Sequence, residues 1–184
     1  MRWLNEPPVW SYEDGVLSLQ TGNQTDFWRK THYGFIRDDG HVYGEDVAGD
    51  FAATVTFSAD YEELYDQAGL MVRLDETNWI KAGIEYTDGK HHLSAVSTRE
   101  FSDWSVLPLE GDPGKVRLRI SRYGEAVRIE YAVGEGAFQM LRLAYLEPDR
   151  PAFVGAMSCS PKRAGLVARF WDFQLGEPDR TLHG

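Results

Sequence analysis

The sequence predicts an all-β protein built as a two-sheet antiparallel sandwich, and three observations lead to this fold class. Apolar and polar residues alternate with a period of two in almost every segment, which is typical of strands with one buried face. Turn-forming pairs such as Asp39-Gly40 and Asp88-Gly89 separate these segments at short intervals. Apart from one turn near residues 61–65, no segment shows a helical stripe, so the strands must pair antiparallel and pack as two sheets or close into a barrel.

The expected strands follow in chain order. Residues 16–21 are expected to form a strand, and residues 68–74 and 80–86 flank a polar loop in a hairpin pattern. Residues 21–49 are weakly periodic and rich in glycine, aspartate and aromatics, and long irregular loops are often functional. The other expected strands are residues 51–57, 92–98, 116–120, 127–133, 138–144, 152–158 and 166–175.

Length and composition are those of one globular domain that covers residues 1–184. With 42% hydrophobic residues, a chain this long buries about 70% of its unfolded surface, enough for a core without disulfides or metal. The single cysteine, Cys159, lies in an apolar run and is expected to be a small core residue in a reducing compartment. The first residues lack a secretory pattern and no apolar run reaches membrane length, so we expect a cytoplasmic protein.

The formal net charge of −10 disfavours partners that are themselves anionic. Nucleic-acid binding depends on a basic surface that neutralises phosphates, and an anionic membrane imposes the same requirement. We therefore expect no nucleic-acid partner and no membrane partner. A neutral ligand, or one that matches a local charge, is compatible with this composition.

The hairpin at residues 67–86 is the most informative segment. If Asn78 occupies the left-handed position of a three-residue loop, Arg73 lies directly opposite Lys81. Two cations in such a position repel each other, so an anion is expected nearby, either Asp75 or Glu85 or a ligand carboxylate or phosphate. Alternation assigns Leu70, Val72, Leu74, Ile80, Ala82 and Ile84 to the core face, and Gln67, Met71, Arg73, Asp75, Trp79, Lys81 and Glu85 to the other.

Two glycines, Gly69 and Gly83, lie on the polar face of this hairpin. A missing side chain there lets another group approach the backbone, as in a ligand groove. The alternative is that glycine accommodates sheet curvature or a bulky neighbour.

Four sequence blocks together resemble one family. They are residues 25–35 (TDFWRKTHYGF), 65–73 (YDQAGLMVR), 79–86 (WIKAGIEY) and 102–105 (SDWS). This combination resembles the largely uncharacterised concanavalin A-like proteins that include the fungal regulation-of-enolase proteins, over roughly residues 1–175. The resemblance implies a jelly-roll sandwich of the lectin/glucanase type. It implies no catalytic residues, and sugar binding by related sandwiches is an analogy of fold alone.

Sugar recognition needs aromatic faces that stack on a pyranose and polar groups that bind its hydroxyls. Trp28, Trp79 and Trp104 each occur beside charged residues, although aromatics in sandwiches more often pack in the core. We therefore predict a binding module for a carbohydrate or a small anionic metabolite. Its candidate contacts are Asp26, Trp28, Arg73, Trp79, Lys81, Glu85, Asp103 and Trp104.

An alternative is a glycoside-acting enzyme in which Glu85 is the catalytic carboxylate, with Asp26, Asp75 or Asp103 as its partner. The Glu-x-Asp-x-x-Glu strand of jelly-roll glucanases is missing, so a hydrolase is the less favoured interpretation. A third hypothesis is a regulatory domain that binds a protein through a flat apolar patch. The strand at 166–175, apolar on both faces near Trp171, indicates a central strand, or alternatively an edge that pairs with a partner.

No metal and no cofactor are expected. The neighbours His91 and His92 point to opposite faces of a strand, so they cannot chelate one ion together. His32 and His41 lie in the irregular segment without ligand spacing. No phosphate-binding glycine loop and no Ser-His-Asp arrangement is present.

Overall fold

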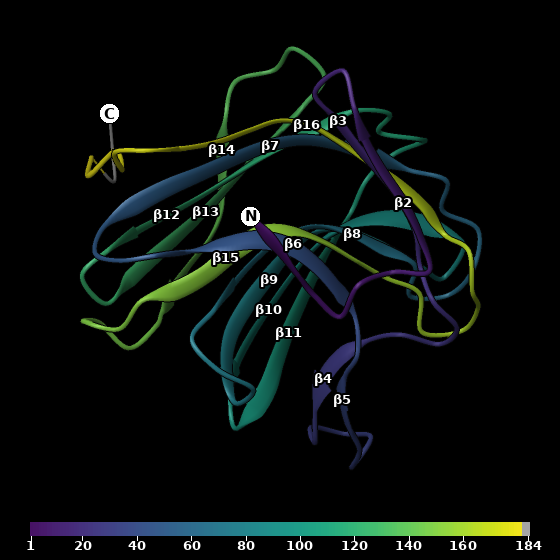
Figure 1. The fold of residues 1–184 in the computed structure, drawn as a ribbon, viewed down its shortest axis with the longest axis horizontal. Coiled ribbons are helices and arrows are strands. Elements are labelled where there is room, and N and C mark those ends of the chain that lie inside the picture. Colours follow the sequence, from purple (N-terminus) through teal and green to yellow (C-terminus); the bar gives the residue numbers. More distant parts are fainter. Residues whose placement is uncertain (182–184) are drawn as a thin grey trace.

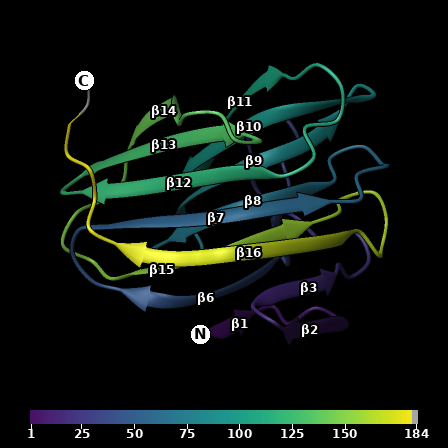
Figure 2. The ribbon, with the colours of Figure 1, turned by 90° about the horizontal axis from the view of Figure 1, so that it is seen from above.

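The computed structural model describes residues 1–181, which form sixteen strands arranged mainly as two packed antiparallel sheets (Figure 1). These residues contain no α-helix, and so none long and apolar enough to cross a membrane. Sheet A runs in the order β1 (Arg2–Leu4), β6 (His41–Val47), β15 (Ala152–Cys159), β8 (Gln67–Arg73), β9 (Asn78–Thr87), β10 (Lys90–Arg99) and β11 (Phe101–Pro108). Sheet B, which faces the viewer in Figure 2, runs in the order β14 (Gln139–Tyr145), β13 (Ala126–Val133), β12 (Val116–Tyr123), β7 (Phe51–Ala59), β16 (Val167–Gly176), β3 (Val16–Gln20) and β2 (Val9–Glu13).

The main hydrophobic core lies between the two sheets. It contains the face of the β8–β9 hairpin that alternation predicted, including Leu70, Val72, Ile80 and Ile84, all nearly inaccessible to solvent. Burying each such side chain contributes about 1.5–3 kcal/mol relative to an exposed position. The predicted all-β sandwich of jelly-roll type is thereby confirmed, as is the central position of the 166–175 strand, because β16 lies between β7 and β3.

The segment at residues 21–49, expected to be an irregular loop, contains three strands. β4 (Phe27–Arg29) and β5 (Ile36–Asp38) form a small separate hairpin, and β6 belongs to sheet A. Strands β1, β2 and β11 were also not predicted. Three-residue strands are too short to display a period, and the exposed strand β11 carries apolar residues on its solvent side as well.

The β4–β5 hairpin covers the outer face of sheet A, on the side away from sheet B (Figure 1). Phe27 is fully buried and its ring meets that of Trp79 edge-on, with centroids 6.1 Å apart. The backbone N–H of Arg29 donates a hydrogen bond to Ser102 Oγ at 2.9 Å, which attaches β4 to β11. A second hydrophobic cluster fills this layer, so β8 and β9 are buried on both faces.

Candidate ligand-binding site

A cavity of about 270 Å³ lies between the outer face of sheet A and the residues around the β4–β5 hairpin. Five of the predicted ligand contacts line it, namely Asp26, Trp28, Lys81, Glu85 and Trp104. Lys81 and Glu85 reach it together because residues four apart on a strand point to the same face. Strand pairing places Trp104 of β11 opposite Val96 of β10, and Val96 opposite Lys81 of β9.

The floor of the cavity holds a buried ion pair. The ammonium of Lys81 lies 3.3 Å from Asp26 Oδ1, and the Lys81 side chain is only 3% exposed. Burial, the largest single influence, disfavours the charged ammonium, but Asp26, Glu85 and the other raising contacts together outweigh it, and the pKa of Lys81 is raised. The same Asp26 oxygen is 3.9 Å from the thiol of Cys159, which is buried here, under the hairpin, and not between the two sheets.

Glu85 is the second buried charge of the floor. Burial raises its pKa from 4.5 to about 7, against the opposing influence of Lys81 and of a hydrogen bond from Ser94. Ser94 Oγ donates to Glu85 Oε2 at 2.8 Å, and Trp104 Nε1 donates to Ser94 Oγ at 3.2 Å. Glu85 therefore titrates near neutrality, and hydrogen bonds connect it through Ser94 to Trp104.

Aromatic side chains form the walls. The ring of Trp28 meets those of Trp104 and Tyr33 edge-on, with centroids 6.3 and 5.6 Å apart. Tyr65 meets Trp104 in the same way at 6.3 Å, and the hydroxyls of Tyr33 and Tyr65 are hydrogen-bonded at 2.9 Å. This hydrogen bond is the first cause of the raised pKa of Tyr65, about 12. Phe35, stacked on Tyr33, extends the wall outward.

The predicted pairing of Arg73 with Lys81 is wrong. In the β8–β9 hairpin Arg73 lies opposite Trp79, and Met71 lies opposite Lys81. The register differs by two residues because the turn is centred one residue earlier than predicted. The backbone N–H of Leu74 donates to the carbonyl of Asn78 at 2.9 Å, and Asp75 Oδ1 accepts hydrogen bonds from the backbone N–H groups of Thr77 and Asn78. No pair of facing cations arises.

Arg73 lies outside the cavity and holds the hairpin in place. Its guanidinium makes a bidentate ion pair with Asp38 of β5, at 2.6 and 2.8 Å. An anion was expected near the two cations, and each cation has its own: Arg73 pairs with Asp38, and Lys81 pairs with Asp26. Neither Asp75 nor Glu85 fills this role for Arg73.

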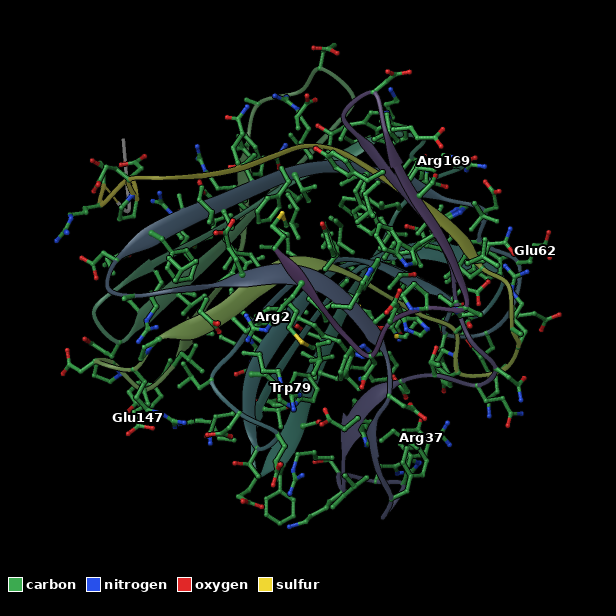
Figure 3. All side chains as sticks on the ribbon, in the orientation of Figure 1. Arg2, Arg37, Glu62, Trp79, Glu147 and Arg169 are labelled. Carbon is green, nitrogen blue, oxygen red and sulfur yellow. The ribbon has the colours of Figure 1, made fainter. Side chains whose placement is uncertain are left out.

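Trp79 and Asp103 also lie outside the cavity. Trp79 is fully buried under Phe27, so neither of its faces is open for stacking; Figure 3 shows it on sheet A and Arg37 on the neighbouring hairpin. Asp103 is on the exposed edge strand β11 and pairs with Arg142 at 3.4 Å. Any contact of these side chains with a ligand stays a prediction.

The two carboxylates proposed beside Asp26 as partners of Glu85 are engaged elsewhere. Asp75 lies in the β8–β9 loop, where burial is outweighed by hydrogen bonds from Arg150, Asn78 and Thr77 that keep its pKa below the ordinary value. With Asp103 on the edge strand, Asp26 is the proposed partner that shares the cavity with Glu85.

Gly69 and Gly83 face each other across β8 and β9. A Cβ added to either would overlap the backbone carbonyl of the partner strand, Ala82 or Ala68. The glycines therefore permit a close approach of two strands, and they do not line the cavity.

Several cavity residues were not among the sequence candidates. Tyr33, Phe35 and Arg37 come from the loop and second strand of the hairpin, Tyr65 from the loop before β8, and Gln67 from the first position of β8. Tyr33, Phe35 and Arg37 had a signal in the concentration of aromatics in the irregular segment, and alternation had placed Gln67 on the polar face of the hairpin. Nothing in the local pattern indicated that this segment folds over β9.

The polar groups of the cavity suit an organic ligand. Lys81 and Arg37 donate hydrogen bonds, Asp26 and ionised Glu85 accept them, and Gln67 does both. Across residues 1–181, no three His, Cys, Asp or Glu side chains are grouped so that they could hold a metal ion.

Solved structures of low sequence identity share the fold. "Bacteroides ovatus Xyloglucan PUL GH43B" superimposes with a TM-score of 0.67 at 19% identity, over 90% of this chain and 34% of that chain. The alginate lyase from Klebsiella pneumoniae gives a TM-score of 0.58 at 10% identity, over 94% of this chain and 85% of that one. Identities this low establish the sandwich fold and nothing about chemistry.

Two yeast comparisons are much closer. The chain is 41% identical over 182 residues to Regulation of enolase protein 1 of Saccharomyces cerevisiae, which covers 98% of this chain and 92% of the relative. A crystal structure of a functionally unknown protein from Saccharomyces cerevisiae superimposes with a TM-score of 0.92 at 41% identity, over 96% of both chains. The profile of the family described as "Protein of unknown function (DUF1349)" matches residues 3–178. The similarity to the yeast protein agrees with the resemblance of the four sequence blocks, and the family match shows that this chain belongs to the DUF1349 family.

Proposed function

We propose that this chain binds a small polar ligand in the cavity on the outer face of sheet A. The observation that supports this most strongly is the enclosure of two buried charged side chains, Lys81 and Glu85, by aromatic walls in one open cavity. Buried charges weaken a fold unless they are paired, and perturbed groups in a cavity commonly serve a function. Glu85, with its pKa near neutrality, is such a group.

The lining favours a ligand about as large as a sugar ring. The volume of about 270 Å³ is close to the lower end of the range of small-molecule sites, roughly 300 Å³. Trp104, which is 36% exposed, offers an accessible aromatic surface, and the floor offers both donors and acceptors. A carbohydrate is therefore the first ligand class to test.

A purely anionic ligand fits the floor less well. Lys81 is already neutralised by Asp26, and an ionised Glu85 adds negative charge. The other cations that line the cavity are Arg37, which pairs with Asp39 at 3.3 Å, and the exposed Lys162. An anionic group would thus lie near the hairpin and the 160–165 loop, away from Glu85.

The test is a thermal-shift and calorimetric screen against mono- and oligosaccharides, sugar phosphates and small carboxylates. A bound ligand raises the melting temperature with dose, because it binds only the folded state. The informative variant is Trp104→Ala, because Trp79 is a buried packing residue whose loss would unfold the layer. Trp10→Ala is the matched control, since Trp10 is 38% exposed, lies on β2 of sheet B and is not part of the cavity lining.

A shift that Trp104→Ala removes and Trp10→Ala retains would support the cavity. Equal loss in both variants would indicate a general loss of stability. No shift with any compound would count against small-ligand binding.

A glycoside-acting enzyme is a second candidate, favoured by the raised pKa of Glu85. A carboxylic acid with a pKa of about 7 is suited to act as a general acid near neutral pH. Asp26 would have to act as the partner carboxylate, although Lys81 already engages it. Turnover of aryl glycosides that disappears in Glu85→Gln, with ligand binding retained, would support this role; binding without turnover would reject it.

A regulatory protein contact is a third candidate, suggested by the name of the yeast relative. The edge strand β11 exposes Phe101, Val106 and Leu107, which are 59%, 40% and 47% accessible. An apolar edge strand is a common protein-docking surface. Co-sedimentation with purified enolase that Leu107→Glu abolishes would support this candidate, and no co-sedimentation at micromolar concentrations would argue against it.

A further inference from the structure

Four aromatic rings in the cavity form a closed circuit, which we call the aromatic box: Trp28, Tyr33, Tyr65 and Trp104. Successive rings meet at steep angles, 75° for Trp28 and Tyr33, 90° for Trp28 and Trp104, and 81° for Tyr65 and Trp104. A hydrogen bond of 2.9 Å between the hydroxyl groups of Tyr33 and Tyr65 closes the circuit. A flat sugar ring needs one aromatic face, whereas rings set at steep angles surround a compact group from several sides.

The four rings come from three separate parts of the chain. Trp28 belongs to β4 and Tyr33 to the loop that follows it, Tyr65 precedes β8, and Trp104 belongs to β11. Tyr33 is 42% exposed and Trp104 is 36% exposed, so both retain accessible surface. Accessible aromatic rings gathered in one cavity are typical of the lining of a ligand site.

The charges beside the box leave one negative group without a full counterion. Lys81 is neutralised by Asp26 at 3.3 Å, and Arg37 by Asp39 at 3.3 Å. Glu85 is 3% exposed and receives a hydrogen bond from Ser94, but has no ion-pair partner within 4 Å among residues 1–181. Burial of an incompletely neutralised carboxylate raises its pKa, and a cation placed beside it would reverse that effect.

We infer that the aromatic box binds an N-alkylated ammonium group of a small ligand, with the carboxylate of Glu85 as its counterion. This inference rests on the proposed small-ligand function and specifies the charge of the ligand. Aromatic faces attract a cation through their quadrupoles, and rings grouped around quaternary ammonium groups are a recurring use of this attraction. An alkylated nitrogen also suits the box because its methyl groups need no hydrogen-bond partners, whereas a primary ammonium would leave donors unsatisfied against the rings.

The exposed Lys162 sets the polarity of the remainder of the ligand. Lys162 lines the cavity from the 160–165 loop. Its ammonium would repel a second cationic group of the ligand and can donate hydrogen bonds to an anionic or hydroxyl group of the ligand. The ligand class that fits both features has an alkylammonium group at one end and an anionic or neutral polar group at the other. Choline is the simplest probe of the first feature.

The experiment is isothermal calorimetry with choline and with dimethylbutanol, its uncharged analogue in which carbon replaces the nitrogen. The two probes have the same shape, so the difference between their affinities reports the charge alone. Choline is expected to bind on the order of tenfold more tightly than dimethylbutanol. Glu85→Gln should abolish most of this preference, because it keeps the hydrogen bond to Ser94 but removes the negative charge.

Two further variants make the test specific. Tyr33→Leu removes one wall of the box at an exposed position, and should weaken choline several-fold with little effect on folding. Asp103→Asn removes a negative charge on the adjacent strand β11 outside the cavity, and should leave the preference unchanged. Thermal unfolding of each variant confirms that the fold is retained.

The outcomes separate this inference from the proposed function. Equal affinity for choline and dimethylbutanol would overturn the inference. Binding of neutral sugars together with no binding of choline would overturn it too, while it leaves the small-ligand function in place. If neither choline nor any compound of the carbohydrate and metabolite screen binds, both proposals fall.

Discussion

Replacing Glu85 with glutamine is expected to stabilise the protein at about pH 8 and to leave its stability almost unchanged at about pH 4. Glutamine has nearly the shape of glutamate and can still accept the hydrogen bond that Ser94 Oγ donates at 2.8 Å. The substitution therefore removes one titratable group from the floor of the cavity with minimal change in packing. Any difference in stability that depends on pH belongs to the ionisation of this carboxyl.

The magnitude follows from the pKa of Glu85, which burial raises from 4.5 to about 7. Each pKa unit corresponds to about 1.4 kcal/mol, so ionising Glu85 in the folded protein costs about 3 kcal/mol relative to the unfolded chain. The side chain is 3% exposed, so solvent screening reduces this figure little. It already includes the favourable influence of Lys81 and Ser94.

The direction is determined by which state holds the proton. Between about pH 4.5 and pH 7 the folded protein keeps the proton of Glu85 while the unfolded chain has released it, so the free energy of unfolding decreases as pH rises. Below this window both states are protonated, and above it both are ionised and the loss is complete. The advantage of Glu85→Gln over the wild type should therefore grow from near zero to about 3 kcal/mol across the window.

Urea denaturation of both proteins at several pH values measures this difference directly. Glu13→Gln, at an exposed position of β2, is the control and should show no such growth. A constant difference between the two stability curves from pH 5 to about pH 8 would show that Glu85 does not have a raised pKa.

Three other predictions concern the surroundings of the cavity. Asp26→Asn should destabilise the fold by about 3 kcal/mol in urea denaturation, because it leaves the buried Lys81 without its ion-pair partner. Adding Lys81→Met should recover part of this loss of stability, and no recovery would refute the ion pair. Gly83→Ala should lower the melting temperature by several degrees, because the Cβ of the new alanine would overlap a backbone carbonyl of β8. Overpacking of this kind costs roughly 1–3 kcal/mol of stability, and an unchanged melting temperature would contradict the close approach of the two strands. Tyr33→Phe should move the pKa of Tyr65 from about 12 towards its ordinary value of 10 in a spectrophotometric titration, and an unchanged titration would exclude the hydroxyl–hydroxyl bond.

Local alternation was sufficient to predict the architecture and the division of faces on β8 and β9. A strand must bury one face, so the apolar positions between Leu70 and Ile84 indicate the core whatever the neighbouring strands are. The same alternation places Lys81 and Glu85 together on the opposite face, and both indeed line one cavity. Apolar periodicity is local information, and the sandwich follows from it.

The register of the β8–β9 hairpin was beyond the reach of the sequence pattern. A shift of two residues preserves which side chains share a face, so alternation cannot distinguish the two pairings. The choice depends on the loop, where Asp75 binds the backbone of Thr77 and Asn78. Arg73 therefore lies on the predicted face of the sheet, but it is paired across the strands with Trp79 and forms its ion pair with Asp38.

Only the tertiary structure decided which residues of the polar face are available to a ligand. The β4–β5 hairpin buries Trp79 under Phe27 and engages Arg73 through Asp38, and it brings Tyr33 to the cavity. None of these contacts has a local signal, because they join segments about 35 to 50 residues apart whose strands are too short to show a period. The sequence by itself determined the sandwich and the charged face of β9, whereas long-range packing of one short hairpin turned that face into a cavity.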